Sequence, residues 1–144
     1  FQRERERCVR LGQEMTLCVM DLDHFKRVND QYGHDAGDAV LKHVAQHLSC
    51  ALRHSDIVGR FGGEEFILIL PDTGLEQAVA VLNRLREELA QTPVPVRGQL
   101  LPVSATFGVT MVQPSDTDLE ATIRRADVAL YEGKGAGRNR VMTA

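Results

Sequence analysis

The sequence predicts an α+β domain in which a mainly antiparallel central sheet is flanked by helices. The continuous apolar run 16–20 has strand length and is typical of a strand buried on both faces. Two short β-prone runs, 57–61 and 66–70, flank a Gly-Gly pair and indicate a hairpin. Segments 40–52 and 75–89 carry apolar residues at helical spacing. Hairpins and helices mixed in one chain favour a sheet with helices packed on it.

Length and composition predict one compact domain with a proper core over residues 1–144. The formal net charge of −3 provides no basic field of the kind that marks a DNA- or RNA-binding domain. The three cysteines share no metal-like spacing, and Cys18 lies in an apolar run, which suits a reducing, cytoplasmic setting. The chain has no signal peptide and no bilayer-spanning run. It begins at Phe1 without Met, so we expect a fragment, and membrane attachment through other segments stays open.

Boundary residues define the elements of the first half of the chain. Gly62 and Gly63 are expected to form a type I′ turn, which needs positive φ at both central residues. Gly12 is a typical helix end, and Pro71 is a typical strand end. The predicted order is a charged helix up to Gly12, the strand 16–20, a short helix over 24–31 that ends before Gly33, a longer helix that opens at Gly37-Asp38, and the hairpin that ends at Pro71.

The second half contains two predicted capping boxes, each of which places a threonine three residues before a glutamate. Thr73 with Glu76 opens a helix over 75–89, and Thr117 with Glu120 opens another over 119–130. The remaining predictions are strands over 94–97 and 100–112 joined at Gly98-Gln99, a chain loosened by Gly133, Gly135 and Gly137, and an edge strand over 140–142.

Four acids follow predicted strand ends. Asp21 and Asp23 end the first strand, and Glu64 and Glu65 lie at the mouth of the hairpin. If the first strand pairs beside the hairpin, these carboxylates meet at one edge of the sheet and favour a hard divalent cation such as Mg²⁺. Asp23 also fits the N-cap of the following helix, and the two glutamates fit solvated turn residues.

Basic and amide side chains occur at positions where they could bind the phosphates and the base of a nucleotide. Lys26 follows the first acids, while Lys134 and Arg138 lie in a glycine-rich segment whose N–H groups can approach phosphate closely. Asn29 and Asp38 are candidate base-reading residues, since a carboxylate accepts from the adjacent donors of guanine. The alternatives are a flexible Gly/Lys loop and an ordinary helix start at Asp38.

These motifs together resemble the GGDEF family of diguanylate cyclases, and the resemblance runs from Asp21 to Asn139 in order and at the family's spacing. The matching segments are Asp21-Leu22-Asp23-His24-Phe25-Lys26-Arg27-Val28-Asn29-Asp30, Gly33-His34, Gly37-Asp38, Phe61-Gly62-Gly63-Glu64-Glu65-Phe66, Ala126-Asp127-Val128-Ala129-Leu130-Tyr131, and Lys134 through Gly137-Arg138-Asn139. The resemblance implies one GGDEF domain with a ferredoxin-like, cyclase-palm fold and a βααββαβ core.

The resemblance also implies the site. Asp21, the Leu22 carbonyl and Glu64 would hold Mg²⁺ or Mn²⁺, with Glu65 close to the metals and Glu64 as the family's proposed base. The substrate would be GTP and the product cyclic di-GMP, formed between two domains of a homodimer controlled by an upstream sensory domain. The implied substrate-binding residues are Lys26, Asn29, His34, Asp38, Gly62, Gly63, Lys134 and Arg138.

A second implied site is inhibitory. Arg53-His54-Ser55-Asp56 precedes the glycine pair at the family's interval, so Arg53 and Asp56 would bind cyclic di-GMP together with Arg84 or Arg86. Taken alone, Arg-x-x-Asp fits a helix-end arginine paired to a nearby acid.

Two departures from the family pattern stand out in the sequence. Thr106 replaces a common Ser, and Gly133 replaces a usual Ala and is expected to loosen the segment at Lys134. The chain also begins after the family's Asp-x-Leu-Thr-Gly-Leu-x-Asn-Arg segment, which borders the nucleotide pocket. Besides the cyclase, the sequence leaves open a catalytically silent cyclic di-GMP receptor and a structural GTP-binding domain.

Overall fold

The computed structural model describes residues 1–144 and contains five helices and seven strands. In chain order they are α1 (Gln2–Leu11), β1 (Met15–Leu22), α2 (Phe25–Tyr32), α3 (His34–Ala51), β2 (Ile57–Arg60), β3 (Glu65–Pro71), α4 (Leu75–Gln91), β4 (Val94–Val96), β5 (Gln99–Leu101), β6 (Ala105–Met111), α5 (Leu119–Gly135) and β7 (Val141–Thr143).

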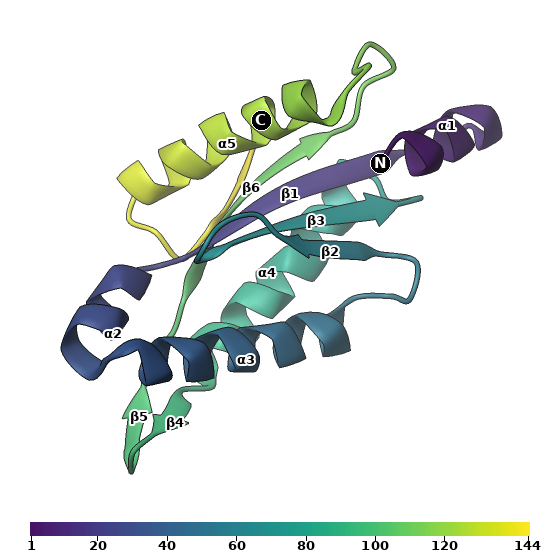
Figure 1. The fold of residues 1–144 in the computed structure, drawn as a ribbon. Helices are drawn as coiled ribbons and strands as arrows, with labels where there is room; N and C mark the ends of the chain where they lie inside the picture. The colour runs from purple at the N-terminus through teal and green to yellow at the C-terminus, as the bar shows by residue number, and fades with distance from the viewer.

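A five-stranded sheet in the order β2-β3-β1-β6-β7 forms the centre of the molecule (Figure 1). β1 pairs antiparallel with both β3 and β6, whereas the edge strand β7 runs parallel to β6. All eight residues of β1 are buried, as the apolar run predicted. The predicted α+β class and mainly antiparallel sheet are confirmed.

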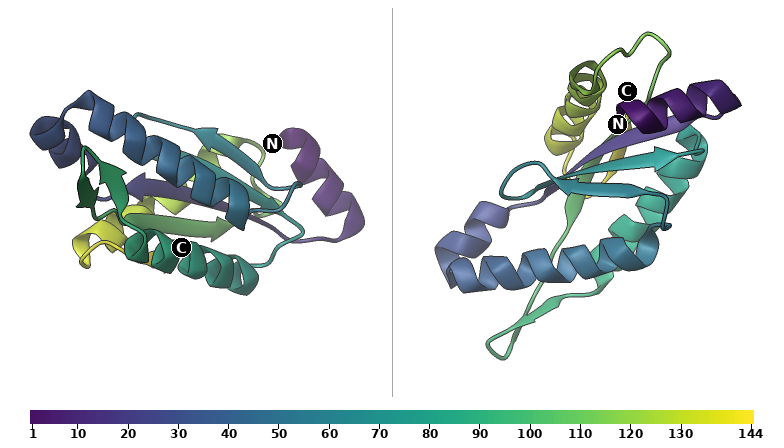
Figure 2. Two further views of the ribbon diagram at one scale, coloured as in Figure 1. Left: turned by 90° about the horizontal axis from the view of Figure 1, so that it is seen from below. Right: turned by 45° about the vertical axis from the view of Figure 1, so that its right-hand side comes forward.

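Helices cover the two faces of the sheet, with α5 and α1 on one side and α3 and α4 on the other (Figures 1 and 2). Alternate residues of β1 serve these two layers. Cys18 and Met20 join the larger core cluster with α3 and α4, while Leu17 and Val19 join the smaller cluster with α5 and α1. The same alternation assigns Asp21 to the α5 face.

The hairpin of β2 and β3 pairs as predicted, but its turn differs. Neither Gly62 nor Gly63 has positive φ, so the type I′ prediction is wrong here. Phe61 N–H donates to the Glu65 carbonyl at 2.9 Å, which leaves a loop of more than two residues. A longer loop does not require the mirror-image turn that a two-residue hairpin needs.

The predicted strand 100–112 is wrong, because the chain breaks it into β5 and β6. Pro102 lies in the gap and has no N–H to donate to a sheet ladder. β5 pairs instead with β4 in a small separate sheet. Its turn consists of Arg97 and Gly98, both with positive φ, rather than Gly98-Gln99. This is the sign combination that type I′ turns require.

Neither predicted threonine is the N-cap of its helix, because in α4 and in α5 the N-cap lies one residue later. The N-cap of α4 is Gly74, whose N–H donates to Gln77 Oε1 at 3.4 Å. The Thr73 hydroxyl donates to the Pro71 carbonyl instead. The N-cap of α5 is Asp118, whose carboxylate accepts from Ala121 N–H at 3.0 Å. Asp outranks Thr at N-cap positions, which accounts for the second shift.

Two other helix boundaries differ from expectation. α3 begins at His34, with Gly33 as its N-cap, instead of at Asp38. α5 continues through Gly135, so Gly133 lies inside a helix and does not loosen a loop. Gly133 is also buried, and a Cβ there would lie 2.8 Å from Thr106 Cγ2. This glycine allows close packing.

None of the five helices is both long enough and apolar enough to cross a membrane. All three cysteines are free thiols, and Cys18 is fully buried. Burial raises the pKa of the Cys18 thiol, so this side chain packs as a small hydrophobe, as predicted.

Candidate active site at the end of β1

The end of β1 lies directly beside the hairpin mouth. Asp21 is the register partner of Glu65 across the β1–β3 pair, and Leu22 N–H donates to the Glu64 carbonyl at 3.2 Å. Acids more than forty positions apart in the sequence therefore meet at one edge of the sheet. The Asp21 side chain is only 3% exposed, whereas both glutamates are half-buried.

Lys134 reaches these acids from α5. Its ammonium forms an ion pair with the Asp21 carboxylate. The helix can lie this close to the sheet because β6 carries Gly108 beneath it. A Cβ at Gly108 would come within 2.1 Å of the Ala126 carbonyl oxygen, so any larger residue would displace α5. The lysine is thus positioned by close packing of α5 on the sheet.

The carboxylates around Asp21 repel one another. Burial, and then repulsion from Asp21, raises the pKa of Glu64, while Lys134 lowers it. The pKa of Glu65 is raised chiefly by burial and by Asp21. Burial also raises the pKa of Asp127, against the opposing effect of Lys134. Asp127 was not predicted as a site residue, although it lies seven positions before Lys134 and hence on the same helix face.

This charge pattern fits a divalent cation. The Lys134 ammonium neutralises the buried carboxylate of Asp21, as a bound metal ion would. No three His, Cys, Asp or Glu side chains cluster closely enough to enclose a metal ion by themselves. Mg²⁺ commonly binds one or two carboxylates together with water and substrate phosphates, so the two-carboxylate set of Asp21 and Glu64 suits that ion.

The predicted base-reading residues come from α2 and α3. Asn29 packs directly over Gly37, where a Cβ would lie 2.0 Å from Asn29 Oδ1. Asp38 directly follows Gly37 and is exposed. Asn29 therefore lies against the residue next to Asp38. Asp38 and Arg60 also line a hollow of about 640 Å³ between α3 and the hairpin. This hollow is large enough for a nucleotide base.

The other predicted substrate residues surround this region. Lys26 on α2 and His34 on α3 are exposed. The Gly63 carbonyl accepts from Arg60 Nη2 at 2.7 Å, and no atom lies within 4 Å of a Cβ built there. A Cβ built at Gly62 would lie 3.8 Å from Glu65 Cβ, so this glycine lies beside the Glu65 side chain.

Asp23 does not have its predicted role as an N-cap. His24 is the N-cap of α2, with positive φ and no side-chain cap hydrogen bond. The Asp23 carboxylate accepts hydrogen bonds from the Ser104 and Thr106 hydroxyls, both at 2.7 Å, and from Asn139 N–H at 3.0 Å. It therefore joins the end of β1 to β6 and to the segment that carries Arg138.

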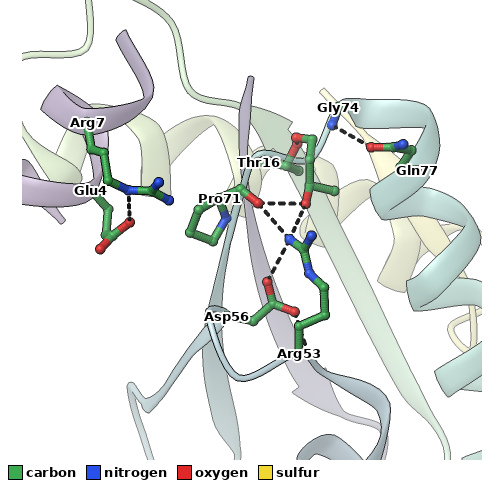
Figure 3. A network of polar contacts seen from close by, with 9 residues as sticks. Glu4, Arg7, Thr16, Arg53, Asp56, Pro71, Gly74 and Gln77 are labelled. Atoms are coloured by element: carbon green, nitrogen blue, oxygen red, sulfur yellow. Dashed lines mark hydrogen bonds and ion pairs between the residues drawn. The ribbon is translucent and has the colours of Figure 1, made fainter. Parts of the chain in front are cut away.

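The predicted inhibitory residues lie at the opposite end of α3 from Asn29 and Asp38. Arg53 Nη2 donates to Asp56 Oδ1 at 3.1 Å, to the Pro71 carbonyl at 2.6 Å and to the Thr73 hydroxyl at 2.8 Å (Figure 3). Both Arg53 and Asp56 line a hollow of about 560 Å³. The Arg53 side chain is nevertheless 53% exposed.

The two candidate arginines of α4 differ in their surroundings. Arg84 is exposed and does not line the hollow beside Arg53. Arg86 instead lies against the C-terminal segment, where its Nη1 is 3.4 Å from Asn139 Oδ1.

Acids from two chain segments, a lysine beside them and a base-sized hollow fit the class of enzymes that act on nucleotides with the help of a divalent cation. Residues 1–140 match the family described as "Diguanylate cyclase, GGDEF domain". The chain belongs to this family, and the predicted resemblance is confirmed.

Relatives agree with this assignment. Over all 144 residues, the chain is 44% identical to "Diguanylate cyclase DgcP" of Pseudomonas aeruginosa, and it spans 21% of that protein's length. It superposes with a TM-score of 0.92 on the diguanylate cyclase SiaD of P. aeruginosa, solved with its activator SiaC, at 43% identity over 99% of this chain and 54% of the other. The GGDEF domain of DgcB from Caulobacter crescentus, solved with c-di-GMP, gives a TM-score of 0.91 at 30% identity, covering 99% of this chain and 82% of the other.

Proposed function

We propose that the protein containing this chain condenses two GTP molecules into one cyclic di-GMP and two pyrophosphates. One observation carries the proposal, namely that the β1–β3 register pairs Asp21 with Glu65 while Leu22 N–H donates to the Glu64 carbonyl. Family membership supplies the substrate class, and the carboxylates supply the metal ligands that a triphosphate substrate needs.

The metal would be held by Asp21, the Leu22 carbonyl and Glu64, with Glu65 nearby. Bound Mg²⁺ or Mn²⁺ supplies charge neutralisation for the attacking and leaving oxygens. The 3′-hydroxyl oxygen of one GTP bonds to the α-phosphorus of the other, the bond from that phosphorus to the pyrophosphate oxygen breaks, and Glu64 is the proposed acceptor of the hydroxyl proton. A second, symmetric condensation closes the ring.

The remaining residues would hold the nucleotide. Asn29 and Asp38 would read the donor edge of guanine, with His34 in the same segment. Lys26, Lys134 and Arg138 would neutralise the phosphates, and the small Gly62 and Gly63 would let backbone approach the triphosphate. Lys134 would then exchange its contact with Asp21 for a phosphate oxygen.

Condensation between two GTP molecules held on separate copies requires a homodimer with facing sites. A two-fold axis suits the symmetric product, since each copy then contributes the same groups. A sensory domain elsewhere in the protein would control this encounter. That inference accords with the 21% of DgcP's length that the chain spans.

The product would also inhibit the enzyme through Arg53 and Asp56, with Arg84 as a further phosphate contact. The hollow beside Arg53 and the partial exposure of its side chain support this role. We predict that Arg53→Ala leaves the initial rate unchanged within about twofold and weakens inhibition by added cyclic di-GMP by about tenfold or more, the scale of one lost charge-assisted contact. Initial rates measured against added product test this prediction, and unchanged inhibition would contradict it.

The proposed activity is tested by incubating the full-length protein with GTP and Mg²⁺ and measuring pyrophosphate together with cyclic di-GMP. Both products should form in wild type, and Glu64→Gln should lose both. Binding of cyclic di-GMP without any turnover would favour the alternative, a silent receptor. GTP binding with neither turnover nor product binding would favour a structural GTP-binding domain.

A further inference from the structure

We infer that Asp23 is a positioning residue that holds the segment 137–139, and hence Arg138, in the geometry that receives the triphosphate. The inference rests on the proposed function, which makes Arg138 a phosphate-binding residue. It assigns the second acid of the Asp-x-Asp pair to hydrogen bonding rather than to the metal.

Asp23 is the centre of a hydrogen-bond network between three segments. Its Oδ1 accepts from the Thr106 hydroxyl, and its Oδ2 accepts from both the Ser104 hydroxyl and Asn139 N–H. Its own N–H donates to the Ser104 carbonyl at 2.9 Å, which fixes the backbone that carries the carboxylate. Asn139 N–H also donates to Thr106 Oγ1 at 3.1 Å. The network thus clamps the end of β1, the start of β6 and the C-terminal segment together.

The clamped segment has a backbone that needs such support. Arg138 and Asn139 are consecutive non-glycine residues with φ of 63° and 44°, directly after Gly137 with φ of 123°. The left-handed region is sterically unfavourable for most L residues, less so for Asn, and it persists only where surrounding contacts determine it. Within this segment, Arg138 N–H donates to the Gly133 carbonyl at 3.0 Å, and the Asp23 carboxylate supports the next residue.

The geometry favours positioning over metal ligation. Asp23 already receives three hydrogen bonds from Ser104, Thr106 and Asn139. Asp21, by contrast, has an ammonium as its ion-pair partner. Metal ligation needs an ionised carboxylate, whereas the observed network also accommodates an amide. An asparagine oxygen can accept from Ser104 and Asn139 while its NH₂ donates to a reoriented Thr106 hydroxyl.

The test compares Asp23→Ala, Asp23→Asn and Thr106→Val in the full-length protein. The measurements are KM and kcat for GTP, affinity for a non-hydrolysable GTP analogue, and thermal melting. Asp23→Ala should raise KM and weaken analogue binding about tenfold with a smaller change in kcat, because it loosens a phosphate contact. Asp23→Asn should stay within about twofold of wild type. Thr106→Val, which keeps the carboxylate, should change KM in the same direction as Asp23→Ala.

Two results would overturn the inference. If Asp23→Asn fails as severely as Asp23→Ala and raised Mg²⁺ restores it, Asp23 is a metal ligand. If Asp23→Ala lowers the melting temperature while KM and analogue affinity stay unchanged, its role is structural only. A wild type without turnover would instead refute the proposed cyclase, and analogue affinity would still decide the role of Asp23.

Discussion

At the scale of single residues, the pair of Lys134 and Asp21 links stability to cation binding. The Asp21 side chain is 3% exposed and the Lys134 side chain is 33% exposed. The negative charge of the buried carboxylate is therefore neutralised by the lysine. An unpaired buried carboxylate is costly, and a divalent cation is the other group that can neutralise it.

We predict that Lys134→Met lowers the free energy of unfolding by about 2 kcal/mol without metal, a value reduced for the partial exposure of the lysine. Added Mg²⁺ should then stabilise this variant more than wild type, because only the variant leaves Asp21 unpaired. Chemical denaturation with and without Mg²⁺ measures both effects. Arg124→Ala, which removes an exposed pair with Glu120, is the control and should change little. An equal response of Lys134→Met and wild type to Mg²⁺ would contradict the account.

The two positions expected from the sequence to depart from the family pattern, Thr106 and Gly133, are neighbours in space. A Cβ at Gly133 would lie 2.8 Å from Thr106 Cγ2. The extra methyl of Thr106 therefore occupies the space that an alanine methyl would need. The second close atom, Met142 Cγ at 2.9 Å, belongs to a flexible side chain.

We predict that Gly133→Ala alone lowers the free energy of unfolding by about 1 kcal/mol, since overpacking outweighs the gain in helix propensity. Combined with Thr106→Ser, the same substitution should be neutral or stabilising. The coupling energy from a double-mutant cycle should then be about 1–2 kcal/mol. Gly135→Ala is the matched control in the same helix, because no atom lies within 4 Å of a Cβ there. Additive effects of the two substitutions would show that the methyl groups do not compete.

At the scale of elements, the connection between β6 and α5 depends on one ion pair. Arg125 of α5 donates to both carboxylate oxygens of Asp116 at 2.7 Å and to the Met111 carbonyl at 2.8 Å. Hydrogen bonds from Arg125 hold the pKa of Asp116 at about 2, below its ordinary value of 3.8. The folded state therefore binds the proton more weakly than the unfolded state does.

This shift predicts a stabilisation of about 2 kcal/mol that is fully present above pH 4 and lost as the pH falls through 2. We expect Asp116→Asn to be less stable than wild type at pH 7 and the difference to shrink by about half at pH 3. Urea denaturation at the two pH values measures it. A difference independent of pH would mean that the carboxylate charge contributes nothing.

Helices and strands were predictable from the sequence where their side chains are almost completely buried. The all-buried β1 and the stripe of α4, with Ala78 and Leu82 fully buried, follow from apolar spacing alone. Boundaries were less predictable, because several adjacent residues could cap each helix and only packing decides between them. Asp118 therefore replaced Thr117 as N-cap, and Pro102 interrupted a strand that its apolar neighbours had suggested.

At the scale of the whole molecule, the candidate site was predictable as far as strand pairing determines it. Once β1 lies beside the hairpin, Asp21 and Glu65 must be neighbours. Asp127 and the network of Asp23 were missed because they depend on how α5 and the C-terminal segment pack on the sheet. The spacing of Asp127 and Lys134 places both on one face of α5, but it does not say which part of the sheet that face contacts.

The central claim is that Asp21 and Glu64 share one divalent cation. Its most direct test is the affinity of the GTP-analogue complex for Mn²⁺, measured by electron paramagnetic resonance for wild type, Asp21→Asn, Glu64→Gln and the double variant. We expect each single substitution to weaken Mn²⁺ binding about tenfold or more and the second to add little, since both remove ligands of one ion. Single substitutions that leave Mn²⁺ affinity unchanged would contradict the account.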